Sequence, residues 1–161
     1  MKKIKLSARL QVLADLIKKG SSVADIGTDH GHLPVYLVQT DTVKKIIASD
    51  ISISSLESAK HSAAEYNVTD KIVFINAPGL EGISPYEVDT IVIAGMGGET
   101  IIDILKDIHR IKNQNINLIL QPQSKLDLLS RFLYDNDHTI RETKIVRDKK
   151  KQYTVISARS G

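Results

Sequence analysis

Residues 22–33, SVADIGTDHGHL, combine acidic and glycine residues at a spacing that suits ligand binding. The apolar residues at the start are typical of a buried strand, and Gly27 and Gly31 allow the sharp turn and close backbone approach that a ligand requires. Asp25 lies near the end of that strand, where its carboxylate can accept hydrogen bonds from a ligand amine or hydroxyl. The segment predicts a strand, a glycine-rich turn and a helix start that hold a nucleotide-like ligand over a parallel sheet.

A second carboxylate stands at the spacing expected for a ribose contact. Residues 46–49 form a mainly apolar segment that ends in Asp50, about twenty residues beyond the glycine turn. The pattern is not a dinucleotide fingerprint, because Asp29 replaces the middle glycine and Asp25 precedes the first one. The form D-x-G-x-D-x-G is instead seen in S-adenosylmethionine-dependent methyltransferases, which disfavours an NAD oxidoreductase.

The other predicted strand ends also carry polar or glycine residues. In a doubly wound sheet, ligands bind outside the carboxyl ends of the strands, so these residues are expected to converge on one rim. The glutamine amides either bind a base edge, since they offer both a donor and an acceptor, or cap a loop. The candidate contacts are Asp25, Gly27, Thr28, Asp29, His30, Gly31, Asp50, Ile51, Asn76, Ala77, Gly95, Met96, Gly97, Gly98, Gln121 and Gln123.

Hydrophobic periodicity predicts the elements that position these ends. Helices are expected where apolar residues recur every three or four positions, and strands where short aliphatic runs occur. Capping boxes are expected at Ser54 with Glu57 and at Ser124 with Asp127. The expected elements are helix 7–18, strand 23–26, helix 33–40, strand 45–49, a helix from residue 54, strand 72–75, strand 90–93, a helix along residues 101–111, strand 117–120, a helix from residue 124, and strands 139–146 and 153–158.

This alternation of strands and helices indicates an α/β, doubly wound sheet with helices on both faces. The last two strands have no helix between them, so we expect a C-terminal hairpin that adds one antiparallel strand to a mainly parallel, seven-stranded sheet. That arrangement is the methyltransferase version of the Rossmann-like fold, whereas a dinucleotide dehydrogenase would continue with another strand–helix unit. We expect residues 1–161 to form one domain.

The composition argues against several other classes of protein. The chain has no cysteine, and His30 and His32 have no matching cluster that would complete a metal site. His61, His109 and His138 are expected on the surface or on a helix face. No apolar run approaches the length of a membrane span, and the N-terminus lacks the apolar core of a signal peptide, so we expect a cytoplasmic protein without a metal or a membrane partner. The net charge of +3 permits an RNA partner.

Five motifs that together span most of the chain are distinctive. They are LSARL at residues 6–10, VADIGTDHGHLP at 23–34, ASDI at 48–51, AGMGG at 94–98 and LQP at 120–122. Together they resemble the bacterial tRNA adenine-N1 methyltransferases that modify position 22. AGMGG stands where many other amino-methylating enzymes have an Asn/Asp-Pro-Pro-Tyr motif.

The resemblance implies methyl transfer from S-adenosylmethionine to N1 of an adenine in tRNA. Asp50 would bind the cofactor ribose, and Asp25 with the turn 27–31 would hold its methionine part. Asp29 is the candidate catalytic residue, because it would face the methyl group and stabilise charge on the adenine ring or bind its amine. The cofactor-binding candidates are Asp25, Gly27, Thr28, Asp29, His30, Gly31, Asp50, Ile51, Asn76, Ala77 and Gly95, and the substrate-binding candidates are Arg9, Met96, Gly97, Gly98, Gln121 and Gln123.

The chain departs from the family pattern at three points. Pro78 stands where the family usually has an Asp, so Asn76 is the candidate contact for the cofactor's adenine. Gln123 stands where the family has Asn. The family also continues into a C-terminal helical module that helps to grip tRNA, whereas this sequence ends at Gly161. We expect a monomer that binds S-adenosylmethionine well and tRNA weakly.

Two alternatives stay open at this point. The chain could be an S-adenosylmethionine-dependent methyltransferase with another acceptor, or a non-catalytic nucleotide- or RNA-binding module on the same fold. Basic residues gather in two clusters, one around Arg9 with Lys2, Lys3 and Lys5, and one along residues 147–151. Each cluster is either solvated surface or a contact for RNA phosphate.

Overall fold

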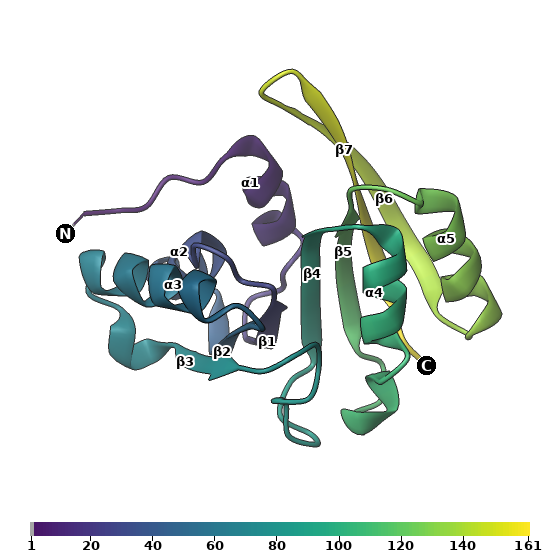
Figure 1. Cartoon of the computed structure of the whole chain (residues 1–161), viewed down its shortest axis with the longest axis horizontal. Helices are drawn as coiled ribbons and strands as arrows, with labels where there is room; N and C mark the ends of the chain where they lie inside the picture. Colours follow the sequence, from purple (N-terminus) through teal and green to yellow (C-terminus); the bar gives the residue numbers. More distant parts are fainter. Residues whose placement is uncertain (1) are drawn as a thin grey trace.

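The computed structural model describes residues 2–161, and its seven strands belong to one sheet. Their order across the sheet is β3-β2-β1-β4-β5-β7-β6 (Figure 1). In chain order the elements are α1 (Ala8–Asp15), β1 (Ser21–Ile26), α2 (His32–Gln39), β2 (Val43–Asp50), α3 (Ile53–Glu65), η1 (Thr69–Lys71), β3 (Val73–Asn76), β4 (Thr90–Met96), α4 (Gly98–Leu105), η2 (Ile108–Arg110), β5 (Asn117–Pro122), α5 (Leu126–Asp135), β6 (Thr139–Asp148) and β7 (Lys151–Arg159).

The pairing of the strands confirms the predicted sheet. β1 to β5 pair in parallel, and β7 is antiparallel to both of its neighbours, β5 and β6. A turn at Lys149 and Lys150 joins β6 to β7, and both residues have positive φ values, 49° and 70°, as in a type I′ hairpin. The hairpin is longer than predicted, because its strands continue as far as Asp148 and Lys151.

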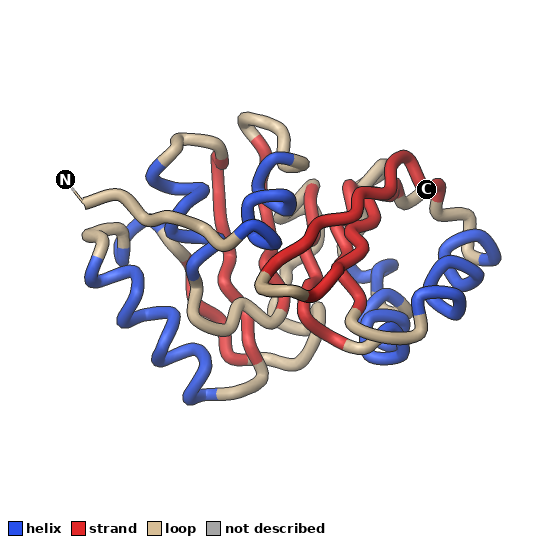
Figure 2. The backbone as a smooth tube through the Cα atoms, turned by 90° about the horizontal axis from the view of Figure 1, so that it is seen from above, coloured by secondary structure: helices blue, strands red, loops and turns tan. Residues whose placement is uncertain are grey.

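Aliphatic residues that alternate along the strands build an apolar layer on each face of the sheet. Helices lie on both sides of the strands (Figure 2). Ile91 and Ile93 of β4 belong to the layer that α4 and α5 cover, whereas Val92 belongs to the layer under α1, α2 and α3. Successive strand residues point to opposite faces, so a central strand with helices on both sides must be apolar throughout. The aliphatic run in β4 was predicted as such a strand.

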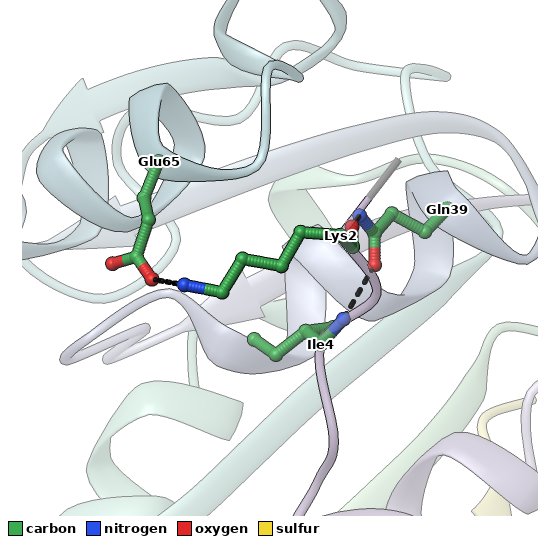
Figure 3. A network of polar contacts seen from close by, with 4 residues as sticks. All are labelled: Lys2, Ile4, Gln39 and Glu65. Carbon is green, nitrogen blue, oxygen red and sulfur yellow. Dashed lines mark hydrogen bonds and ion pairs between the residues drawn. The ribbon is translucent and has the colours of Figure 1, made fainter.

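The N-terminal segment is anchored on α2 and α3 before α1 begins (Figure 3). Lys2 Nζ lies 2.6 Å from Glu65 Oε2, at the end of α3. The backbone N–H of Ile4 donates to Gln39 Oε1 at 2.8 Å, and Gln39 Nε2 donates to the carbonyl of Lys2 at 2.8 Å. These contacts hold the segment that leads into α1 against α2 and α3. They also pair one lysine of the N-terminal basic cluster with a carboxylate.

Two helix starts differ from the predicted capping boxes. Ser52 caps α3 by accepting a backbone hydrogen bond on its Oγ, so Ser54 lies inside the helix. α5 begins after Lys125, which adopts a left-handed conformation and makes no side-chain cap. Ser124 instead accepts the N–H of Gly98 on its carbonyl at 2.9 Å. The predicted capping boxes are therefore wrong, although both helices form.

Two features of the second half also differ from expectation. The helix predicted along residues 101–111 divides, because α4 ends at Leu105 and the short η2 follows. His138, expected on the surface or on a helix face, is buried beside Phe132 in the turn between α5 and β6. Its Nδ1 has no hydrogen-bond partner among residues 2–161, and burial lowers the pKa of the ring.

Gly31 sets how closely α2 can approach α3. It has a φ of +71°, and a Cβ built on it would lie 2.8 Å from the Cβ of Ala59 in α3. A side chain at this position would strain the backbone and also push the two helices apart. The second glycine of the turn is therefore required for packing as well as for conformation.

We expect Gly31→Ala to lower the free energy of unfolding by about 1–3 kcal/mol more than Gly20→Ala does. Gly20 has a similar φ of +89°, but nothing lies within 4 Å of a Cβ built on it. Both variants therefore strain the backbone, and Gly31→Ala alone adds the overlap with Ala59. Urea unfolding followed by circular dichroism measures both losses, and equal losses would contradict the packing role of Gly31.

Candidate active site

A cavity of about 460 Å³ lies at the carboxyl ends of β1, β2 and β4, beside the start of α1. This is the edge at which ligands bind in doubly wound sheets. The volume lies within the range of roughly 300–1,000 Å³ that small-molecule sites occupy. Three carboxylates, those of Asp25, Asp29 and Asp50, line it. Among the described residues that line the cavity, only Arg9 carries a permanent positive charge.

Asp50 links the turns that follow β1 and β2. Its Oδ2 accepts the backbone N–H of Asp29 at 3.0 Å, and its Oδ1 accepts the N–H of Ser52 at 3.0 Å. These two hydrogen bonds orient the carboxylate at the wall of the cavity. Each oxygen has a further lone pair, so Asp50 can still accept hydrogen bonds from two hydroxyl groups of a ligand.

Asp25 is the most deeply buried acid of the site, with 6% of its surface exposed. Burial raises the pKa of its carboxyl to about 7, because a charge is costly where water is excluded. The carboxylates of Asp50 and Asp29 raise this pKa further, whereas a 2.9 Å hydrogen bond from Thr28 Oγ1 and the charge of Arg9 lower it. A cationic ligand beside Asp25 would lower this pKa and so favour the ionised carboxylate.

The rim of the cavity is formed by the turn between β1 and α2. Asp29 has a φ of 57°, and its side chain is 69% exposed. The ring of His30 contacts the Oγ of Ser58 through Nδ1 at 2.8 Å and stacks on His32. The side chain of Met96, at the end of β4, packs so closely on Gly27 of this turn that a Cβ there would overlap its Cε. The turn therefore presents the Asp29 carboxylate at the mouth of the site.

Arg9 is held in place by Gln121, which is fully buried. Gln121 Oε1 accepts one hydrogen bond from Arg9 Nη1 at 3.0 Å and another from the N–H of Gly95 at 3.1 Å. At Gly95 the pairing of β4 with β5 shifts, so this N–H bonds to the side chain of Gln121. One amide oxygen thus positions the guanidinium and the end of β4 together.

The hairpin supports α1 from the other side (Figure 1). Asp148 Oδ2 accepts the N–H of Arg9 at 3.1 Å, and Ser7 Oγ accepts the N–H of Leu10 at 3.3 Å. These are first-turn N–H groups, which have no partner within the helix and attract a negative charge. The guanidinium of Arg9 also lies over the ring of Tyr153, at 5.7 Å from its centroid. The hairpin therefore takes part in placing Arg9 at the cavity.

The structure brings most of the predicted site residues together. Of the cofactor candidates, Asp25, Gly27, Thr28, Asp29, His30, Asp50 and Gly95 line the cavity, and of the substrate candidates, Arg9, Met96 and Gln123 do. Ile51, Asn76 and Ala77 lie beside Asp50 at the same rim but outside the cavity lining. Gly31 is also outside the lining and packs against Ala59 of α3. Asn76 Nδ2 donates to the carbonyls of Asp50 and Ile51, at 2.9 and 3.2 Å, and so braces this rim.

Three substrate candidates need correction. Gln121 does not offer its amide to a base, because it is buried and its oxygen already accepts two hydrogen bonds. Gly98 leaves no room for a base, since a Cβ there would lie 2.6 Å from the carbonyl oxygen of Ser124. Gly97 faces the Oγ of Ser124 in the same way, at 3.0 Å. These glycines allow the β5–α5 loop to pack against the start of α4.

Sequence reasoning missed several residues of the lining. They are Ser7, Leu10, Leu13, His32, Leu33 and Ala94. Three of them, Ser7, Leu10 and Leu13, belong to α1 or its cap, within the helix predicted for residues 7–18. The signal that could have identified them is Arg9, a charged residue between the apolar positions of that helix.

Two features of the described residues bear on partners. Within residues 2–161, no group of three or more His, Asp or Glu side chains is arranged to hold a metal ion. Over the same residues, no helix is both long and apolar enough to cross a membrane.

Comparison with known proteins identifies the family. Residues 6–156 match the sequence profile described as a methyltransferase domain. Over its whole length the chain is 35% identical to the tRNA (adenine(22)-N(1))-methyltransferase of Bacillus subtilis (strain 168), of which it covers 68%. The chain belongs to the tRNA (adenine-N1)-methyltransferase family.

Solved structures of tRNA (adenine-N1)-methyltransferase relatives share the fold of the chain. Streptococcus pneumoniae Sp1610 in complex with S-adenosyl-L-methionine is 31% identical, with a TM-score of 0.91 over 98% of this chain and 74% of that one. TrmK of M. capricolum in complex with S-adenosyl-homocysteine is 31% identical, with a TM-score of 0.87 over 97% of this chain and 69% of that one. The predicted fold and family are both confirmed.

In this member of the tRNA (adenine-N1)-methyltransferase family, we expect Asp25 to make stability depend on pH between about 4 and 7. Its pKa rises from an ordinary 3.8 to about 7 on folding, so in this window the folded state holds a proton that the unfolded state has released. The free energy of unfolding should therefore fall as pH rises, by up to about 1.4 kcal/mol per pH unit from this group.

The matched variant is Asp25→Asn, which keeps an oxygen for Thr28 but cannot titrate. Urea unfolding of both proteins at several pH values gives the difference between them. We expect the stability of the native protein to decline relative to Asp25→Asn from pH 4 to pH 7. A constant difference across this range would contradict the raised pKa.

Proposed function

We propose that this chain transfers a methyl group from S-adenosylmethionine to N1 of an adenine in tRNA, at position 22. One observation carries the proposal: Asp25, Asp29 and Asp50 surround a single cavity at the strand ends, where they suit a positively charged ligand with ribose hydroxyls. The similarity of the whole chain to a tRNA (adenine(22)-N(1))-methyltransferase supports the choice of acceptor.

The residues of the cavity fit S-adenosylmethionine in charge and in hydrogen bonding. Asp50 retains lone pairs for the two ribose hydroxyls, because its two backbone partners use one lone pair on each oxygen. Asp25 would accept a hydrogen bond from the methionine amine, whose charge favours the ionised carboxylate. When bound, S-adenosylmethionine supplies a methyl group on a positively charged sulfur.

The protein's task is then mainly to position the two reactants. Adenine N1 already has a lone pair, so attack on the methyl carbon needs no strong base. The new N–C bond forms as the S–C bond breaks, and the positive charge passes from sulfur to the adenine ring. Holding the reactants in line is worth roughly 7–11 kcal/mol of the barrier. The turn at 27–31 and the end of β4 are the rigid elements that would do this.

Asp29 is the residue best placed to stabilise the product charge. It lines the mouth of the cavity on the turn that Asp50 fixes, and its carboxylate is open to a ligand. We propose that it faces the adenine ring, where a negative charge favours the cationic product over the neutral base. Met96, Gly95 and Gln123 line the same cavity beyond Gly27 and would border the base. Because adenine N1 is paired in a duplex, the target must be unpaired or flipped out of its stack.

Methyl transfer to defined RNAs tests the proposal directly. The chain would be incubated with methyl-labelled S-adenosylmethionine and two tRNA transcripts that differ only in having adenine or guanine at position 22. We expect label in the first transcript as N1-methyladenosine and none in the second. Equal labelling of both, or transfer to neither, would contradict the proposed acceptor.

We expect Asp29→Asn to reduce the turnover number by about 100-fold, with little change in the dissociation constant of S-adenosylmethionine. The amide keeps the shape of the side chain and tolerates the left-handed backbone, but it cannot stabilise a cation. Asp41→Asn is the matched control, because Asp41 is also exposed with a φ of 53° and lies outside the cavity. Single-turnover kinetics and calorimetry separate the two quantities. Loss of cofactor binding with an unaltered single-turnover rate would show that Asp29 is only a cofactor ligand.

A further inference from the structure

A second cavity of about 230 Å³ adjoins the first. It is lined by Pro122, Gln123, Lys151, Gln152 and Tyr153, which come from the end of β5 and the start of β7. Gln123 lines both cavities. Tyr153 gives a second connection, because its ring meets the guanidinium of Arg9, which lines the first cavity. We call this second cavity the hairpin groove.

The position of Lys151 in the hairpin groove is fixed by the same contact that positions α1. Lys151 pairs directly with Asp148 across the hairpin, and Asp148 binds the N–H of Arg9. The turn between the two strands is as short as a hairpin allows, with both of its residues at positive φ. Lys151 is therefore held at the hairpin groove, which shares Gln123 with the first cavity.

The chemistry of the hairpin groove suits one nucleotide of a polyanionic strand. An ammonium group lies at its edge, and the amides of Gln123 and Gln152 offer both donors and acceptors for ribose or base. Tyr153 adds an aromatic ring, as in many sites for unpaired RNA. None of the described residues that line this groove is acidic, whereas three carboxylates line the first cavity. The two cavities thus favour ligands of opposite charge.

We propose that the hairpin groove binds the nucleotide next to the target adenine in the RNA strand, with its phosphate against Lys151. This inference rests on the proposed function, because it assigns the strand that leads into the first cavity. When a base is flipped into the first cavity, the adjoining nucleotides of the RNA strand must lie on the protein surface next to it. The hairpin groove is such a neighbouring surface, because Gln123 lines both cavities. Lys151 therefore fixes the register of the RNA, while other basic residues add attraction that does not depend on position.

The first test compares Lys151→Gln with Lys144→Gln, a change of the same chemistry on the same hairpin but outside the groove. We expect Lys151→Gln to raise the KM for tRNA about 3-fold or more and to lower the salt slope of RNA binding by about 1. The dissociation constant of S-adenosylmethionine and the turnover number at saturating tRNA should not change. Lys144→Gln should resemble the native protein, and equal effects of the two variants would overturn the proposal.

The second test removes the charge from the RNA. tRNAs would be prepared with a neutral methylphosphonate on either side of the target adenosine and assayed with the native protein and with Lys151→Gln. One of the two methylphosphonates should raise the KM of the native protein but should not raise the KM of Lys151→Gln further, because the two changes remove the same contact. Additive losses at both phosphates would overturn the groove assignment. If the native protein fails to methylate unmodified tRNA, the proposed function fails first, and the groove assignment falls with it.

Discussion

The carboxylate of Asp50 holds together the two turns that form the site. Through one oxygen it fixes the backbone at Asp29, and through the other it fixes the backbone at Ser52. Hydrogen bonds to a charged acceptor are stronger than those between neutral groups, so this residue sets the geometry of the mouth before a ligand arrives. The same carboxylate raises the pKa of Asp25, which connects the shape of the site to its charge. A site with three acids close together gains from a cationic ligand, because each carboxylate is then partly compensated.

A second network connects the site to the end of the chain. Gln121, buried in β5, holds both Arg9 of α1 and the irregular end of β4, while Asp148 of β6 caps the same helix. The hairpin thus serves two purposes in one element. It supplies the antiparallel strand that completes the sheet, and its tip supports the helix that borders the cavity. Changes in the hairpin therefore alter the position of Arg9, even though the two segments lie at opposite ends of the sequence.

The sequence predicted those parts of the structure that depend on short-range signals. Aliphatic runs identified the strands, and the residues that follow them identified the rim, because the carboxyl ends of parallel strands meet at one edge. Asp25, Asp29 and Asp50 could therefore be placed in one cavity from spacing alone. The capping boxes at Ser54 and Ser124 were also short-range signals, but they failed. In α3 the cap lies two residues earlier, at Ser52, whose N–H donates to Asp50, and in α5 the carbonyl of Ser124 accepts the N–H of Gly98.

The contacts that join distant segments could not be predicted in the same way. Gln121 and Arg9 are 112 residues apart, and nothing in a single sequence shows that an amide at the end of β5 will be buried under a guanidinium from α1. For the same reason Gly98 was predicted to contact the substrate, whereas it is the point where the β5–α5 loop packs. The hairpin groove also depends on such a contact, since Asp148 joins α1 to the strand that precedes Lys151.

The acids at the ends of β1 and β2 suit S-adenosylmethionine and not a dinucleotide. Titration calorimetry of the chain with S-adenosylmethionine and, separately, with NAD⁺ distinguishes the two ligands. We expect one-to-one binding of S-adenosylmethionine, no measurable binding of NAD⁺, and loss of binding in Asp50→Ala that circular dichroism shows to be folded. Preferential binding of NAD⁺, or unchanged affinity for S-adenosylmethionine in folded Asp50→Ala, would contradict this assignment of the site.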